Sequence, residues 1–363
     1  MKKLCSVLFI LLLTFNNLNA QGERPKNIII LIGDGMGINY VGASILQNAV
    51  SPFNDFKSIG LSITCSADKL ITDSAAGASA IATGYLTNNK YISVDTLGNP
   101  LTTIFEYAES LGLSTGVVVS STVSHATPGA FLGHTKDRND QITIAEQMVL
   151  GNYDVIIGGG LKYFLPKNLN GDREDQNNLL EILQKKGFQT AKNFPELTAI
   201  EDSVKQFYAL LEMDGLPEAS KRNFTLGDLT KQAITHLKNN DNGFVLMIEG
   251  SQIDWAGHDH KSKELLEEVN DFSTAITEAL NFAKSDGNTL IVVTSDHETG
   301  GMSITKGSRN AVELELSYTT TSHTASPVGI FSYGPGEEIF RGIMNINNIG
   351  QNLFKLLNPD YKF

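Results

Sequence analysis

Six short, continuous apolar runs constrain the fold of this chain more than any other feature of its sequence. Each run is rich in Val and Ile, and glycine or polar residues follow at its C-terminal end. Strands with one face in water alternate apolar and polar residues, whereas strands covered on both faces are apolar throughout. The runs are therefore typical of a mostly parallel sheet covered on both sides. They are NIIILIGDG, GVVVSS, DVIIGGG, GFVLMIEG, TLIVVTSDHE and PVGIFSYGPG.

Segments with helical spacing of apolar residues lie between these runs. Two of them end at Gly112 and Gly187, and glycine is the usual residue just past a helix C-terminus. We therefore predict a doubly wound α/β fold with a mostly parallel central sheet and helices on both faces, in which ligands gather at the C-terminal strand ends. Two segments are interpreted as small insertions: about 161–240, polar and mostly helical, and 303–322, a short Ser/Thr-rich excursion.

The N-terminus has the pattern of a secretory signal peptide. Residues 1–20 combine a basic start, an apolar run too short to span a bilayer, and a small residue, Ala20, at the expected cleavage point. Cleavage there leaves one domain, 21–363, exported to the periplasm or beyond and free of the membrane. Loss of Lys2 and Lys3 takes the formal charge from −12 to −14, which disfavours nucleic acid as a specific partner.

Carboxylates and imidazoles follow four of the predicted strands. Because parallel strands present their C-terminal ends at one edge of the sheet, these side chains are expected to share one crevice. Several buried carboxylates in one crevice repel each other unless cations are present, which is the first argument for bound metal. The residues are Asp34, His125, Thr127, Glu249, Asp254, His258, Asp296 and His297.

Residue spacing refines the metal prediction. Asp254 and His258 are one helical turn apart, and Asp296 precedes His297 directly. Zinc accepts both imidazole nitrogen and carboxylate oxygen, so the two pairs indicate two zinc sites. Either pair alone could be a solvated surface feature, but their joint occurrence at strand ends favours metal. A set of oxygen ligands, Asp34, Thr127 and Glu249, suits magnesium better.

One serine, Ser74, heads a segment made almost entirely of Ala and Gly. In ITDSAAGASAIATG, Asp73 and Ser74 lie where a helix is expected to begin. Ser74 is thus either a helix cap or a nucleophile beside a helix N-terminus, and we favour the nucleophile. The segment lacks the G-x-S-x-G elbow of Ser-His-Asp hydrolases. The GDGMG stretch that starts at Gly33 lacks the third glycine of a dinucleotide-binding loop.

Six motifs together resemble one enzyme family. They are LIGDGMG, TDSAAGASA, SHATPGAFLGHTKDR, EGSQIDWAGH, VTSDHETGG and SHTASPVGIFSYGPG, in this order, and they extend from about Asn27 to Gly336. This set resembles the alkaline phosphatases, most closely the short secreted bacterial members.

The resemblance implies a homodimeric hydrolase of small phosphate monoesters that works through a phosphoserine intermediate on Ser74. It implies two zinc ions and one magnesium ion per subunit, with Arg138 binding the phosphate. Asp34, Asp296 and His297 would hold the zinc beside Ser74; Asp254, His258 and His323 would hold the other zinc; and Asp34, Thr127 and Glu249 would hold magnesium.

Two residues depart from the enterobacterial pattern of this family. His125 replaces an Asp, so it either supports the magnesium site or binds zinc there instead. Trp255 replaces a Lys and is expected to weaken retention of product phosphate. Two alternatives stay open: a phosphodiesterase or sulfatase of the same superfamily, and a non-catalytic exported metal-binding protein.

Overall fold

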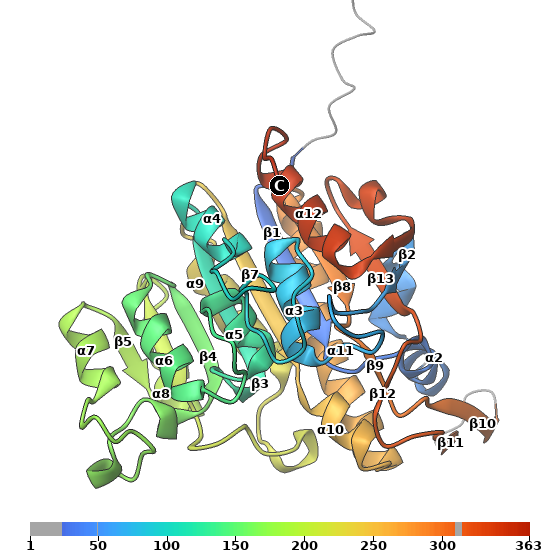
Figure 1. Cartoon of the computed structure of the whole chain (residues 1–363), viewed down its shortest axis with the longest axis horizontal. Helices are drawn as coiled ribbons and strands as arrows, with labels where there is room; N and C mark the ends of the chain where they lie inside the picture. The colour runs from blue at the N-terminus through green and yellow to red at the C-terminus, as the bar shows by residue number, and fades with distance from the viewer. Residues whose placement is uncertain (1–23, 49, 309–313) are drawn as a thin grey trace, which may run out of the picture.

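The fold is built on one ten-stranded sheet with helices on both faces (Figure 1). The computed structural model describes residues 24–48, 50–308 and 314–363, so the predicted signal peptide lies outside the described residues. In spatial order the strands are β14 (Gly342–Asn345), β2 (Ser58–Ile63), β13 (Val328–Tyr333), β8 (Thr289–Thr294), β1 (Asn27–Gly33), β7 (Phe244–Gly250), β3 (Ser114–Thr122), β4 (Val155–Gly159), β6 (Phe207–Leu210) and β5 (Gln189–Ala191).

All six apolar runs form strands of this sheet, and the predicted fold class is confirmed. One of the six, β13, is antiparallel to both of its neighbours, β8 and β2. A parallel connection needs a crossover, usually a helix, to carry the chain back along the sheet. The described residues between β8 and β13 contain only short strands, turns and loops, so the chain returns directly and runs antiparallel.

Both faces of the sheet are covered along the strands formed by the six apolar runs, which explains why these runs do not alternate. In β1, Ile28, Ile30 and Ile32 pack into one apolar core, and Ile29 and Leu31 pack into another. The first core is closed by α3 (Ser74–Thr83), α4 (Ile104–Ser110), α5 (Ala126–Leu132), α6 (Gln141–Leu150), α7 (Leu179–Lys185) and α12 (Ile346–Leu357). The second is closed by α2 (Ile38–Gln47), α8 (Phe194–Thr198), α9 (Leu226–Leu237), α10 (Gln252–His258) and α11 (Ser262–Asp286).

The segment 161–240 is not the mostly helical insertion expected from its sequence. It contributes β6 and β5, which extend the central sheet to one of its edges. These strands have four and three residues, too few to show a distinct apolar run. Within the described part of the chain, no helix is long and apolar enough to cross a membrane.

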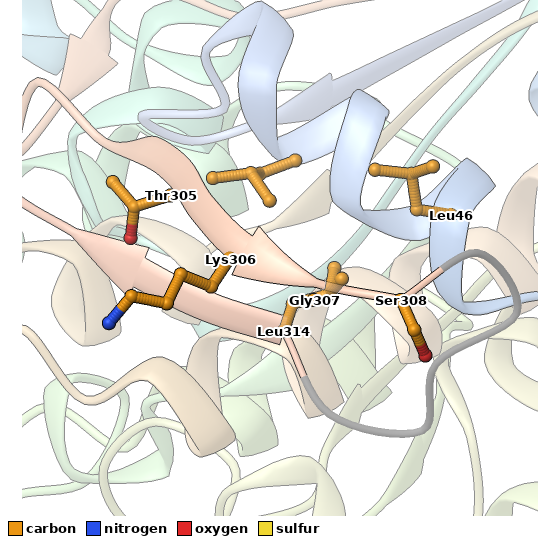
Figure 2. A pocket seen from close by; sticks show the side chains of 7 residues that line it. Leu46, Thr305, Lys306, Gly307, Ser308 and Leu314 are labelled. Carbon is orange, nitrogen blue, oxygen red and sulfur yellow. The ribbon is translucent and has the colours of Figure 1, made fainter.

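The segment 303–322 carries a two-stranded antiparallel ribbon outside the central sheet, formed by β10 (Ser303–Gly307) and β11 (Leu314–Ser317). A groove between this ribbon and α2 is lined by Leu46, Ile304, Lys306 and Leu314 among others (Figure 2). Lys306 is paired with Glu315 at 3.0 Å. The residues that line this groove include none of the candidate site residues predicted from the sequence.

Candidate metal centre and nucleophile

The predicted site residues meet at the C-terminal ends of the strands, because three adjacent strands, β8, β1 and β7, are parallel and in register. Ile32 of β1 pairs with Glu249 of β7 and with Thr294 of β8. Asp34 and Asp296 each follow their strand by one or two residues, so they lie beside Glu249. The short strands β9 (Glu298–Thr299) and β12 (His323–Thr324) and helix α10 lie near the same strand ends (Figure 1).

Asp34, Asp296 and His297 form the first group of potential metal ligands. One donor atom from each lies within 4.8 Å of the others, and all three residues are fully buried. His297 Nε2 is 3.4 Å from Asp34 Oδ1 and 3.3 Å from Asp296 Oδ2. Neither oxygen of Asp34, nor Oδ2 of Asp296, has a hydrogen-bond partner. Burial, reinforced by the neighbouring carboxylates, raises the pKa of Asp34 well above its usual range. A bound cation would offset the free-energy cost of keeping these buried carboxylates ionised.

Asp254, His258 and His323 form the second group, and the two imidazoles show how it is oriented. His258 Nδ1 lies 2.7 Å from the carbonyl oxygen of Thr321, and His323 Nδ1 lies 2.9 Å from that of Thr72. A carbonyl only accepts, so Nδ1 carries the hydrogen in both rings. The two Nε2 atoms then face each other at 3.1 Å, close to Asp254. Two facing lone pairs require a proton or a metal ion between them.

The pKa shifts of the imidazoles differ between the two groups. The hydrogen bond with Asp254 raises the pKa of His258 to about 9, so a metal ion binding there must displace a proton. Burial lowers the pKa of His297 to about 4, even though Asp296 opposes the change. His297 is therefore neutral at pH 7, which is the form of imidazole that binds metal.

Ser74 lies at the start of α3, against the first group. Asp73 caps the helix by accepting a hydrogen bond from Ala76 N at 3.0 Å, and Ser74 Oγ is 3.2 Å from His297 Nε2. A Cβ atom at Gly77 would lie 2.8 Å from the carbonyl oxygen of Asp296. The small residues thus let α3 approach the strand end closely enough to bring Ser74 to the potential ligands.

Arg138 is tied to the same helix start. Its Nη1 donates to Asp73 Oδ2 at 3.1 Å, and that oxygen also accepts from Lys90 N at 3.0 Å. Asp73 therefore holds both the first turn of α3 and the guanidinium group next to Ser74. The sequence placed Asp73 and Ser74 together at the helix start and named Ser74 as the possible cap, whereas the structure shows that Asp73 is the cap. The pairing of Asp73 with Arg138 was missed, because 65 residues separate the two partners and no local pattern links them.

Glu249, Thr127 and His125 form a third set of candidate ligand residues, and each has an unpaired buried polar atom. Glu249 Oε2 accepts from Ser251 Oγ at 2.6 Å, whereas Glu249 Oε1, Thr127 Oγ1 and His125 Nδ1 are buried without a partner. Burial raises the pKa of Glu249 to about 7. The nearby Thr127 hydroxyl opposes this shift, although its position does not satisfy the geometry of a hydrogen bond to Glu249. Burial also lowers the pKa of His125 to about 4. Together with Asp34, this third set offers oxygen and imidazole donors of the kinds that bind magnesium or zinc. Asp34, Glu249 and His125 do not together make one of the groups of described residues whose donor atoms lie within 4.8 Å of one another.

Trp255 forms a wall beside this third set. Its side chain projects from α10 and is 36% exposed. The ring of His125 meets the indole edge to face, with centroids 6.1 Å apart and planes at 80°. A Cβ atom at Gly215 would lie 3.3 Å from the indole, so Trp255 also packs against that loop. An uncharged aromatic surface therefore faces the space next to the potential metal ligands.

Comparison with known proteins identifies the family. The family model described as "Alkaline phosphatase" matches residues 25–315, most of the chain. The chain belongs to the alkaline phosphatase family. Alkaline phosphatase 4 of Bacillus subtilis is 32% identical, and the alignment covers 92% of this chain and 88% of the relative. Alkaline phosphatase 3 of the same organism is also 32% identical, and the alignment covers 94% of this chain and 90% of the relative. The solved alkaline phosphatase of the Antarctic bacterium TAB5 is 37% identical, with a TM-score of 0.86 over 93% of this chain and 98% of that one.

Membership of the alkaline phosphatase family makes this chain a metal-binding enzyme that hydrolyses phosphate monoesters. It disfavours the alternative of a non-catalytic binding protein. The alkaline phosphatase from Thermus thermophilus, only 21% identical, has the same fold with a TM-score of 0.85. The architecture thus persists at low sequence identity.

Proposed function

We propose that the chain hydrolyses phosphate monoesters through a phosphoserine intermediate on Ser74, with two zinc ions and a third ion, magnesium or zinc. One observation carries the proposal. The Ser74 hydroxyl, at a helix N-terminus, lies 3.2 Å from the Nε2 atom on which the first ligand group converges. The unpaired carboxylate oxygens of that group fit a divalent cation.

Each residue has a distinct role in the proposed reaction. Metal ions held in the two groups would neutralise the attacking and leaving oxygens of an in-line displacement. The Ser74 hydroxyl loses its proton to solvent, Oγ attacks phosphorus to form a new Oγ–P bond, and the bond to the alcohol oxygen breaks. The departing oxygen takes up a proton from water to give the alcohol. Arg138, already fixed by Asp73, holds two non-bridging oxygens of the phosphoryl group bidentately. Water then cleaves the Oγ–P bond and releases inorganic phosphate.

The identity of the third ion depends on His125. Two solved variants of the TAB5 enzyme, in which one histidine is replaced by Asp or Glu, are described as having magnesium "bound in the M3 site". A carboxylate at such a position thus accompanies magnesium in that relative. Imidazole is a better ligand for zinc than for magnesium. We infer that His125, with its unpaired Nδ1, shifts the third set of this chain towards zinc.

The proposed function is tested by substrate comparison and by trapping the intermediate. We expect turnover of a generic aryl phosphate monoester to exceed that of a diester and a sulfate ester by orders of magnitude. Acid quenching during turnover of a radiolabelled monoester should leave phosphate on the peptide that contains Ser74. Preferred cleavage of the diester or sulfate, or label on Thr127 instead, would contradict the proposal.

Replacing Trp255 with lysine is expected to strengthen inhibition by inorganic phosphate. A cation would then face the site where an uncharged indole now lies. A gain of about 1.4 kcal/mol would lower the inhibition constant about tenfold. Trp255→Phe is the matched control, because it keeps an aromatic wall and adds no charge. An inhibition constant that is unchanged or higher in Trp255→Lys would refute this role.

Export and dimerisation are further proposals. The basic and apolar pattern of residues 1–20 supports cleavage after Ala20, and the family resemblance supports a homodimer. N-terminal sequencing of the exported protein and sedimentation of the purified enzyme would test them.

A further inference from the structure

The three imidazoles of the two ligand groups are oriented in different ways. His258 and His323 donate their Nδ1 hydrogens to backbone carbonyl oxygens, which no substitution removes. His297 Nδ1 instead lies 3.2 Å from a side-chain hydroxyl, Oγ1 of Thr299. The same hydroxyl donates to Oδ1 of Asp254, a member of the other group. Thr299 thus contacts one potential ligand from each group.

We propose that Thr299 is a positioning residue that joins the two metal groups, by directing Nε2 of His297 to one ion and an oxygen of Asp254 to the other. This inference rests on the proposed function, because it takes the two groups as zinc sites.

The direction of the hydrogen bonds follows from the atoms involved. A threonine hydroxyl has one hydrogen, and an ionised carboxylate can only accept. Thr299 therefore donates to Asp254 and accepts from His297, so Nδ1 of His297 carries the ring hydrogen. The lone pair is left on Nε2, which points towards Asp34, Asp296 and Ser74. Partners of this kind fix the tautomer and ring orientation of metal-binding histidines.

The surrounding backbone holds Thr299 in this position. Thr299 is fully buried; its backbone N donates to the carbonyl oxygen of Gly35 at 3.1 Å, and its own carbonyl accepts from the Tyr40 hydroxyl. Gly35 has φ +68°, and a Cβ atom there would lie 2.6 Å from Thr299 Oγ1 and 2.8 Å from Asp254 Oδ1. Only glycine leaves room for the Thr299 hydroxyl to reach the carboxylate.

The test compares variants of Thr299 that keep or remove the hydroxyl. Thr299→Ser and Thr299→Ala differ by one oxygen atom, and Thr299→Val keeps the branched shape. Zinc affinity of the metal-stripped full chain is measured by competition with a chromophoric chelator. We expect Thr299→Ala and Thr299→Val to bind zinc about 10- to 100-fold more weakly, and Thr299→Ser to stay within a few-fold of the wild type.

A second readout follows the imidazole directly. Nitrogen-15 NMR of histidine in the zinc-loaded protein should show a protected Nδ1–H for His297 in the wild type and in Thr299→Ser. This protection should be lost in Thr299→Ala. The matched control is Thr230→Val in α9, which removes another fully buried threonine hydroxyl, bonded to the carbonyl oxygen of Leu226, far from the site in sequence. Its zinc affinity should be unchanged.

The outcomes separate this inference from the proposed function. Wild-type zinc affinity in Thr299→Ala, or equally weak binding in Thr299→Ser, would overturn the positioning role. If Thr299→Val fails to fold, the comparison of Ala with Ser decides alone, since neither adds a methyl group beside Asp254. Absence of zinc binding by the wild type, or of label on Ser74, would overturn the proposed function instead.

Discussion

Replacing Ser74 with alanine is expected to lower kcat for phosphate monoesters by roughly 10⁴- to 10⁶-fold, the range seen when an enzyme loses its nucleophile. The reason is chemical: without Oγ the displacement has no acceptor for the phosphoryl group. Zinc content should change little, because the ligand groups are formed by other residues. The helix should also persist, since its cap is Asp73. Steady-state rates combined with metal analysis check both expectations.

Ser79→Ala is the matched control for the loss of a buried serine from the same helix. The Ser79 hydroxyl accepts from Ser93 N at 2.8 Å and contacts Tyr91 O, and no potential ligand is among its partners. This variant is expected to lose about 1 kcal/mol of stability and keep its activity. Near-normal turnover by Ser74→Ala would remove Ser74 from the mechanism, whatever the control does.

Much of the fold could be predicted because burial on both faces leaves a strong sequence pattern. The run NIIILIG can be continuously apolar only because alternate residues face two separate cores. Four strands of the sheet lie outside the six runs: β14 and β2 towards one edge, and β6 and β5 towards the other. Three of them, β14, β6 and β5, have four residues or fewer. The antiparallel direction of β13 depends on the connection that precedes it, which the apolar run itself does not encode.

The site residues could be predicted where they directly follow strands of the sheet. They were harder to predict where residues distant in the sequence come together. Asp34, Glu249 and Asp296 are brought together by strand register alone. His323 reaches the site because β12 pairs with β9, a two-residue ladder that spacing could not indicate; only the family resemblance suggested it. The contacts of Thr299 with Asp254 and His297 left no sequence signal, because they depend on how side chains converge.

Removing bound metal with a chelator is expected to abolish activity and to lower the unfolding temperature. Asp34, Asp254, Asp296 and Glu249 are all buried at one edge of the sheet. Without cations, at least some of these carboxylates must take up protons or remain charged at high cost, and a phosphate anion would face them without the positive charge of the metal ions. A ligand that binds only the folded state adds about 2.7 kcal/mol of stability at 100 times its Kd, so zinc should reverse the change.

Adding zinc and magnesium back separately to the metal-free enzyme distinguishes the three sets of ligands. Zinc alone should restore most of the activity, since both histidine-containing groups suit it, whereas magnesium alone should restore little. If His125 shifts the third set towards zinc, added magnesium should raise activity only slightly, and His125→Asp should make the response to magnesium larger. A sample dialysed in the same way without chelator is the control for losses during handling. Activity that survives verified removal of metal would exclude the mechanism, because the unpaired oxygens of Asp34 and Asp296 would then have no role in turnover.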